Sequence, residues 1–218
     1  MTDARVPNDG QAPQTSSTLL CRIQEQDAEA WKRFVDLYTP LVSRWCQAAG
    51  LQAADGEDIR QNVFQAVSRA VGSFHHDAER GSFRGWLKAI TRNKIRDFRG
   101  RKPVGGDGVG GSDAQAVLNA LPEAADDRED AAEETREELI LMRRAIEMVL
   151  DELTEVNRKA FLRIVVGEED PVEVARELGT TPNAIYLVKS RVKRRLREEF
   201  EGLLDLGSTP KSPEGQGN

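Results

Sequence analysis

Apolar residues recur at steps of three and four along most of this chain, the spacing that places side chains on one face of an α-helix. The first pattern predicts two helices within residues 18–50, with Ser17 or Thr18 and then Asp27 as N-caps. Its large side chains are Trp31, Phe34, Tyr38, Leu41 and Trp45. We expect this series to lie in the core, Gly50 to end the second helix, and Pro40 to kink or split it.

Two more helices are predicted before residue 103. One runs from about residue 56 to 73 and leaves Asp58, Gln61 and Asn62 on its polar surface. Its apolar positions are Ile59, Val63, Ala66, Val67 and Ala70. The other covers residues 82–102, with Phe83, Trp86, Leu87, Ile90 and Phe98 on its apolar side. Four helices on one core predict a compact domain over residues 18–102.

A second helical unit is predicted from residue 136 onward. Thr154 can cap a helix there, and Asp170-Pro171 and Thr181-Pro182 each place a capping residue before a proline, which is a strong helix start. Gly179 ends the short helix between them, so a helix-turn-helix is predicted. The expected buried positions are Leu139, Met142, Ala145, Ile146, Val149, Leu153, Val156, Phe161, Ile164, Val165, Val172, Ala175, Leu178, Ile185, Val188, Val192 and Leu196.

Charge divides the chain into the same units. The stretch 103–138 contains eleven acids, two arginines and five early glycines, which is typical of a flexible, self-repelling linker. Both polar ends, residues 1–17 and 205–218, are expected to be disordered. We therefore predict an all-α protein with two helical domains, at 18–102 and 136–204, joined by an acidic linker at 103–135.

Basic residues gather in two places. The segment 82–102 carries eight basic residues and one acid, although the whole chain has a net charge of −6. Five of the eight follow each other at helical steps, where like charges repel unless a polyanion neutralises them. They are Arg84, Lys88, Arg92, Arg96 and Arg99. The last predicted helix carries six more cations, so both units are expected to contact DNA.

Residues that could support catalysis or hold a metal are few. The chain has no phosphate-binding Gly loop, no acid-base pair beside a nucleophile and no metal-ligand spacing, so we expect no enzyme, no cofactor and no metal. Cys21 and Cys46 are expected to be free thiols, and His75 and His76 ordinary loop residues. Without a membrane-spanning run or signal peptide, we expect a cytoplasmic protein with no membrane contact and no small-molecule substrate.

Three segments together resemble bacterial sigma factors of the sigma-70 family, extracytoplasmic function (ECF) group. They are EDIRQNVFQAV, GSFRGWLKAITRNKIRDFRGRK and VEVARELGTTPNAIYLVKSRVKRRL. The resemblance implies a role for each segment. The first would dock on the β′ clamp helices of RNA polymerase, the second would open and read the promoter −10 element, and the third would read the −35 element. It implies the polymerase core, including its β subunit, and promoter DNA as partners, and leaves an anti-sigma factor open as another.

Candidate site residues follow from this resemblance and from the exposed helix faces. The polymerase contacts are Asp58, Gln61, Asn62 and Phe64, with Asn62 in place of an acid often found there. The −10 contacts are Arg84, Lys88, Arg92, Asn93, Arg96 and Arg99, with bases facing Asn93 and the loop 74–85. In the recognition helix the family usually has a Lys-Ser-Arg triplet, and we expect Tyr186-Leu187-Val188 to stand in its place, so the family's base contacts do not carry over directly. The −35 contacts, taken from the exposed face, are Asn183, Tyr186, Lys189, Lys193, Arg194 and Arg197.

Other readings stay open at this point. A stand-alone helix-turn-helix regulator explains residues 171–200 but leaves the basic segment 82–102 without a role. A helical adaptor with incidental basic faces predicts binding that is insensitive to salt. The acidic linker is either a tether or an active element that keeps free DNA from the basic surfaces.

Overall fold

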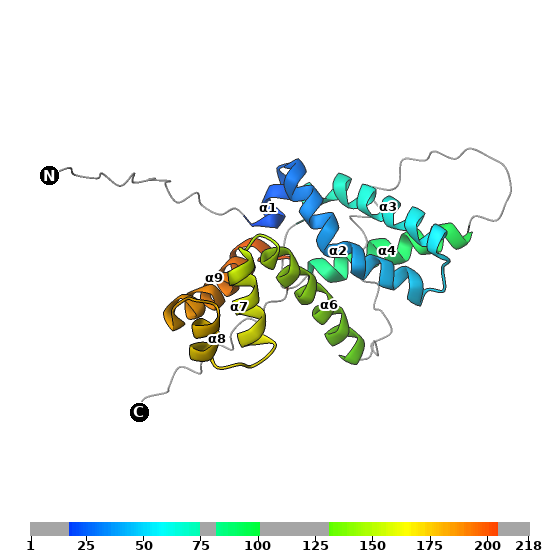
Figure 1. Ribbon diagram of the computed structural model, residues 1–218. Helices are drawn as coiled ribbons and strands as arrows, with labels where there is room; N and C mark the ends of the chain where they lie inside the picture. The colour runs from blue at the N-terminus through cyan, green and yellow to red at the C-terminus, as the bar shows by residue number, and fades with distance from the viewer. Residues whose placement is uncertain (1–17, 75–81, 101–130, 205–218) are drawn as a thin grey trace, which may run out of the picture.

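The computed structural model describes residues 18–74, 82–100 and 131–204, and it confirms the all-α fold class (Figure 1). The elements are α1 (Leu19–Gln24), α2 (Ala28–Ala48), α3 (Ala53–Ala70), a 3₁₀ turn (Val71–Ser73), α4 (Phe83–Gly100), α6 (Ala131–Leu150), α7 (Glu155–Val165), α8 (Pro171–Glu177) and α9 (Pro182–Phe200). The predicted tails, most of the predicted linker, and both histidines lie outside the described residues.

Helix α2 is the centre around which the other helices pack. Its N-cap is Asp27, whose Oδ1 accepts hydrogen bonds from the N–H groups of Glu29 and Ala30 at 2.9 and 3.0 Å. The helix continues through Pro40 to Ala48, so the predicted split is wrong. Tyr38 and Leu41, on either side of the proline, are fully buried. Their packing outweighs the cost of about 3 kcal/mol that an interior proline imposes.

Aromatic rings fill the space between α2, α3 and α4. Phe34 of α2 meets the rings of Phe64 and Phe83 edge-on, with centroids 5.9 and 5.6 Å apart. Phe34, Tyr38 and Phe83 are at most 1% exposed. The aromatic series of the sequence is therefore the core, as predicted, and it holds α4 with one face inward.

The second half of the chain packs on the first. Helix α6 contacts α2, and α9 contacts both α6 and α1 (Figure 1). One hydrophobic cluster runs from Phe34 through Leu141 and Val149 to Phe200. The hydroxyl of Tyr38 donates to the carbonyl of Leu203 at 2.6 Å across the same contact. The predicted unit 136–204 therefore shares its main core with the first unit, and only the contact of α7, α8 and α9 has a separate small cluster.

Helix boundaries and faces in this half differ from the prediction at five points. Helix α6 begins at Ala131, inside the predicted linker. Leu139, Val156, Val165 and Val172 were expected to be buried, but they are 63%, 47%, 39% and 60% exposed. The buried face of α6 is turned by about a quarter of a helical turn from the predicted one, because it includes the carboxylate of Glu137. Only apolar residues were counted as buried positions in the prediction. Glu137 was therefore left out, and the buried face was placed on the neighbouring side of the helix.

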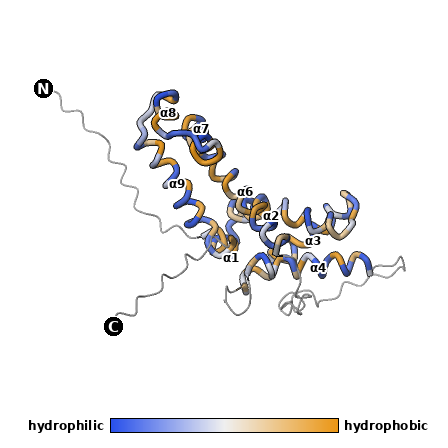
Figure 2. The backbone as a smooth tube through the Cα atoms, turned by 90° about the horizontal axis from the view of Figure 1, so that it is seen from below, coloured by the Kyte–Doolittle hydropathy of each residue, from blue (hydrophilic) through white to orange (hydrophobic). Residues whose placement is uncertain are grey.

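The outer part of the second unit projects away from α3 and α4 (Figure 2). Both views place α7 and α8 at the opposite end of the molecule from α3, with α2 and α6 between them (Figures 1 and 2). Both cysteines are free, and burial raises the pKa of the Cys46 thiol. Among the described helices, none is both long and apolar enough to cross a membrane.

Candidate nucleic-acid interface

Helix α4 presents its basic residues along one side because its other side is fixed in the core. Phe83, Leu87 and Ile90 are at most 1% exposed, and Ile95 continues the same face. The hydroxyl of Thr91 donates to the carbonyl of Leu87 at 2.9 Å, so this polar side chain is satisfied within the helix. The exposed cations that remain on the far side are Arg92, Arg96 and Arg99, with Asn93 and Lys94 partly exposed.

Arg84 does not point outward as predicted. Its side chain is 8% exposed, and its guanidinium donates to the carbonyl oxygen of Glu134 at 3.0 Å and to the Glu134 carboxylate at 3.0 Å. A third bond reaches Glu138 at 3.2 Å. The first turn of α4 lies against α6, and a guanidinium is buried there only because these oxygens surround it.

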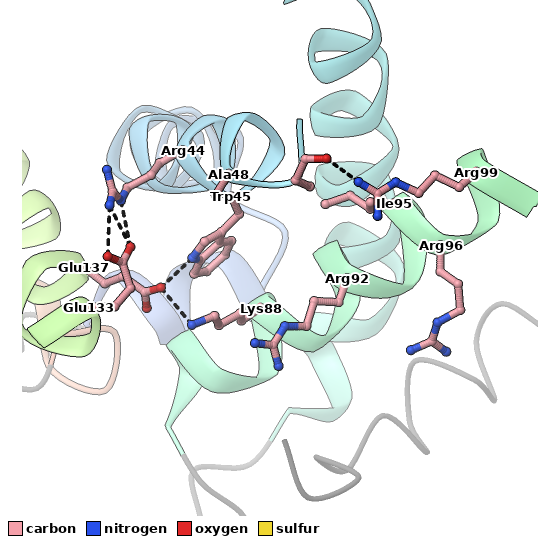
Figure 3. A pocket seen from close by; sticks show the side chains of 11 residues that line it. Arg44, Trp45, Ala48, Lys88, Arg92, Ile95, Arg96, Arg99, Glu133 and Glu137 are labelled. Carbon is pink, nitrogen blue, oxygen red and sulfur yellow. Dashed lines mark hydrogen bonds and ion pairs between the residues drawn. The ribbon is translucent and has the colours of Figure 1, made fainter. Parts of the chain in front are cut away.

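Glu137 joins the two halves of the chain at the next turn of α6 (Figure 3). This residue is 2% exposed, and its Oε1 accepts hydrogen bonds from Trp45 Nε1 at 2.7 Å and Lys88 Nζ at 2.8 Å. The ammonium of Lys88 also lies 5.9 Å from the centre of the Trp45 ring. Lys88, a second predicted −10 contact, is therefore held by α6 in this structure.

Arg44 of α2 completes this contact. Its guanidinium donates to Glu133 at 2.8 to 3.0 Å, and these bonds lower the pKa of the Glu133 carboxyl below its ordinary value. We call the carboxylates that α6 presents to α2 and α4 the acidic face of α6: Glu133, Glu134, Glu137 and Glu138. All four belong to the acid-rich stretch that the sequence placed at the linker.

A pocket of about 600 Å³ opens where α2, α4 and α6 meet (Figure 3). Five of its eleven lining residues are basic, Arg44, Lys88, Arg92, Arg96 and Arg99, and the others are Trp45, Ala48, Ala49, Ile95, Glu133 and Glu137. Arg99 also donates to the carbonyl of Ala49 at the end of α2. Five cations facing two carboxylates leave a surplus of positive charge, which suits the phosphates of a nucleic acid.

The predicted polymerase contacts divide into two groups. Asp58, Gln61 and Asn62 are exposed on one side of α3, where the Gln61 amide donates to Glu57 Oε1 at 3.2 Å. Phe64 is 6% exposed and packs on Phe34, so it is not part of this surface. The resemblance placed it beside the polar residues, but its ring fills the gap between α2 and α3.

The tight connection from α8 to α9 is built by local bonds. Asp170 caps α8 by accepting from the N–H of Val172 at 2.7 Å, and Thr181 caps α9 by accepting from the N–H of Ala184 at 3.2 Å. Between them Gly179 has a φ of +64°, in the left-handed region that glycine adopts without strain. These three residues turn the chain so that α9 packs on α8.

Helix α9 exposes all six predicted −35 contacts, but one step of the assignment was wrong. Val188 is 6% exposed and packs inward, so it cannot stand in a DNA-facing triplet. The sequence contains Lys189-Ser190-Arg191 immediately after it, and all three are exposed. Ser190, Arg191 and Leu187 are exposed on the same helix, although the predicted set did not include them.

The structure does not bring the two predicted sets of DNA contacts together. The predicted −10 set follows α4, whereas the predicted −35 set lies on α9, at the other end of the α2–α6 contact (Figure 2). Part of the loop 74–85 lies outside the described residues. In the ranges 18–74, 82–100 and 131–204, no three His, Cys, Asp or Glu side chains are grouped so that they could hold a metal ion.

Comparison with known proteins identifies the family. Residues 34–102 match the model of Sigma-70 region 2. RNA polymerase sigma factor NccH of Alcaligenes xylosoxydans xylosoxydans is 30% identical over 183 residues, which are 84% of this chain and 91% of that protein. The probable RNA polymerase sigma factor RfaY of Xanthomonas campestris pv. campestris is 27% identical over 188 residues, and the match spans 84% of this chain and 44% of RfaY.

Solved structures give a weaker comparison. CnrH, in complex with the cytosolic domain of CnrY, shares 22% identity with a TM-score of 0.33, covering 82% of this chain and 92% of that one. The identity and coverage of NccH, together with the region 2 match over α2 to α4, decide the assignment. The chain belongs to the sigma-70 family of RNA polymerase sigma factors, in the extracytoplasmic function group, and is a transcription initiation factor.

Proposed function

We propose that this sigma factor binds the RNA polymerase core, recognises the −35 and −10 elements of a promoter, and helps to open the DNA between them. The observation that carries the proposal is the basic side of α4, which the buried side of the same helix holds in a fixed position. A fixed row of cations can follow a phosphate backbone, which is what melted promoter DNA offers.

Polymerase docking is assigned to the exposed side of α3. Asp58, Gln61 and Asn62 offer one carboxylate and two amides on a rigid helix, and the neighbouring Glu57 adds a second carboxylate. The bond from Arg60 lowers the pKa of Glu57, so this carboxylate is charged at neutral pH. Such a surface fits a basic and polar helix, and we assign it to the β′ clamp helices, with the β subunit as a further contact of the factor.

The −10 element is assigned to α4 and the −35 element to α9. Arg92, Arg96 and Arg99 are exposed and would hold the backbone of the melted strand, with Asn93 facing its bases. Arg84 and Lys88 extend the same row, but they are bonded to α6 in the structure. On α9, Lys193, Arg194 and Arg197 would contact phosphates, and the first two turns of the helix would meet base edges.

The contact between α4 and α6 makes the proposed binding of the −10 element by α4 conditional. The acidic face of α6 occupies the positions in which phosphates would neutralise Arg84 and Lys88. DNA and α6 cannot use these cations at the same time, so full engagement of the −10 element requires α6 to leave. This assigns to the start of α6 the shielding role that the sequence suggested for the linker. An anti-sigma partner remains a proposal, with no described surface assigned to it.

The central test is reconstitution with core polymerase. The chain should co-purify with core enzyme and give an open-promoter footprint on genomic promoters selected by the complex. Asp58→Arg with Gln61→Ala should abolish co-purification and leave the helical content unchanged, because both residues are exposed. Tight operator binding by the chain alone, without a footprint from the complex, would support a stand-alone regulator instead.

A further inference from the structure

Two exposed apolar side chains stand among polar ones at the start of α9. Tyr186 is 55% and Leu187 is 54% exposed, in the first two turns of the helix. The other exposed positions of α9 from residue 183 to 197 are all polar: Asn183, Lys189, Ser190, Arg191, Lys193, Arg194, Arg195 and Arg197. An isolated surface leucine is ordinary, but here it lies within a surface otherwise suited to phosphates and base edges.

Leu187 faces directly away from the protein. The buried residues of α9 are Ile185, Val188, Val192, Leu196 and Phe200. At 100° per residue, Leu187 is on the opposite side, four residues after Asn183 and four before Arg191. It is also outside the small cluster that packs α8 on α9, which contains Ile185 but not Leu187. Packing within the chain therefore does not account for a leucine at this position.

The chemistry of the major groove supplies a partner for such a side chain. Base edges there carry hydrogen-bond donors and acceptors, and the one apolar group among them is the C5-methyl of thymine. The first residues of a recognition helix are those that reach base edges. Leu187 placed over a cytosine or guanine edge would strip water from polar groups and offer them no bond.

We propose that Leu187, with Tyr186 beside it, reads a thymine methyl in the −35 element and so helps to set promoter specificity. The proposal rests on the proposed assignment of the −35 element to α9. The cations of the same helix hold the phosphates and contribute affinity for any sequence, whereas the leucine contributes preference at one base pair.

The test removes the methyl group from the DNA and the leucine from the protein. Holoenzyme reconstituted from the full chain first selects −35 sequences from a randomised library. Each thymine of the selected element is then replaced, one at a time, by deoxyuridine, which differs only by the methyl. At one thymine we expect affinity to fall by about fourfold, the effect of one buried methyl group.

Variants assign this effect to Leu187. Leu187→Ala should lower affinity for thymine DNA by a similar factor and make the holoenzyme indifferent to the deoxyuridine exchange. Leu187→Met, which keeps an apolar side chain of similar size, should retain the preference. Leu139→Ala is the matched control, since this leucine is exposed on α6; it should leave both affinity and methyl preference unchanged.

The outcomes distinguish a failure of the Leu187 assignment from a failure of the proposed promoter-binding function. If holoenzyme binds promoters but no thymine shows a methyl effect, or Leu187→Ala keeps the effect, the assignment of Leu187 is wrong and the proposed function stands. If no holoenzyme forms, or no −35 sequence is selected, the proposed function fails and the inference fails with it.

Discussion

Glu137 shows how one buried carboxylate can join two halves of a chain. It accepts from the indole of Trp45 and the ammonium of Lys88, and its side chain is 3% exposed. Both donors are enclosed with it, since Trp45 is 8% exposed and the Lys88 side chain 16%. Removing the acceptor therefore takes one bond from each donor in a poorly solvated place.

For Glu137→Ala we expect a loss of about 3 kcal/mol in the free energy of unfolding, the usual effect of breaking a buried ion pair. Denaturant titration of the full chain measures it. Glu147→Ala, on the same helix, removes an exposed pair with Arg143 and a long, partly exposed pair with Arg144, and should cost about 0.5 kcal/mol or less. Equal losses for the two variants would show that the Glu137 contact adds no stability.

Phe64 separates a structural role from a binding role on α3. Its ring packs edge-on against Phe34, so Phe64→Ala should lower the free energy of unfolding by about 3–5 kcal/mol. Gln61→Ala, one turn earlier on the exposed side, should leave stability within about 0.5 kcal/mol of the original and weaken polymerase binding. If the Phe64→Ala protein kept its stability but lost polymerase binding, Phe64 would be a polymerase contact and not only a core residue.

The pKa of Glu133 predicts how the contact with α2 depends on pH. Bonds from Arg44 lower this pKa in the folded state below the ordinary value of 4.5. A lowered folded pKa means that the stabilisation is fully present above pH 4.5 and is lost as the pH falls through the folded pKa. Thermal unfolding between pH 6 and 3 should therefore show a loss in acid that is smaller in Glu133→Gln. Identical pH profiles would exclude this contribution.

Residues with local partners could be predicted from the sequence, and residues with distant partners could not. The caps Thr18, Asp27, Asp170 and Thr181 were identified because each bonds to the backbone two or three residues ahead. Arg84 was placed outward because its partners, Glu134 and Glu138, are about fifty residues away. A helical repeat shows which side of a helix is charged, but not which charges another helix will cover.

At the scale of elements, the connection between α8 and α9 depends on backbone shape. Gly179 has a φ of +64°, and a Cβ there would meet no atom within 4 Å, so strain alone opposes a side chain. Gly179→Ala should therefore cost about 1–2 kcal/mol, and the misplaced α9 should weaken −35 binding. Gly72 also has open space but no positive φ, so Gly72→Ala is the control and should lose neither stability nor −35 binding. A Gly179→Ala protein as stable as the original would show that the turn tolerates any residue.

The order of the helices could be predicted from the apolar periodicity. Where each helix begins, ends or continues through a proline depends on packing in the whole core, which the periodicity does not show. Pro40 does not break α2, because side chains on both sides of it are buried. Helix α6 extends back to Ala131 through residues whose composition alone is typical of a linker. Its acids have cations of α2 and α4 as partners, and those partners are invisible in a local window of sequence.

At the scale of the whole molecule, the acidic face of α6 covers part of the surface proposed for DNA. Arg84 and Lys88 belong to the row that also contains Arg92, Arg96 and Arg99, but the first two are bonded to α6. The structure thus describes a closed arrangement, in which the second half of the chain lies on the first through charged and apolar contacts alike. DNA that uses the complete row must compete with the acidic face of α6.

This competition predicts that neutralising the acidic face of α6 strengthens DNA binding by the chain itself. In Glu134→Gln/Glu137→Gln/Glu138→Gln, Arg84 and Lys88 lose their ion pairs with α6, so phosphates compete with fewer carboxylates for them. We expect binding to a pre-melted −10 DNA to tighten by about tenfold, the effect of weakening the closed state by about 1.4 kcal/mol. Two added phosphate contacts should also steepen the plot of log affinity against log salt by about 1.5 units.

The slope distinguishes direct contact from a general change in charge. Glu147→Gln/Asp151→Asn/Glu155→Gln removes three negative charges from α6, from the turn after it and from α7, where the ion-pair partners Arg143, Arg158 and Lys159 lie outside α4. This control raises the net charge equally, so it should bind slightly more tightly with the original slope, because no additional cation reaches the DNA. Fluorescence anisotropy at several salt concentrations measures both quantities. If the two triple variants share one slope, Arg84 and Lys88 do not join the DNA contact, and the acidic face of α6 does not compete with DNA for them.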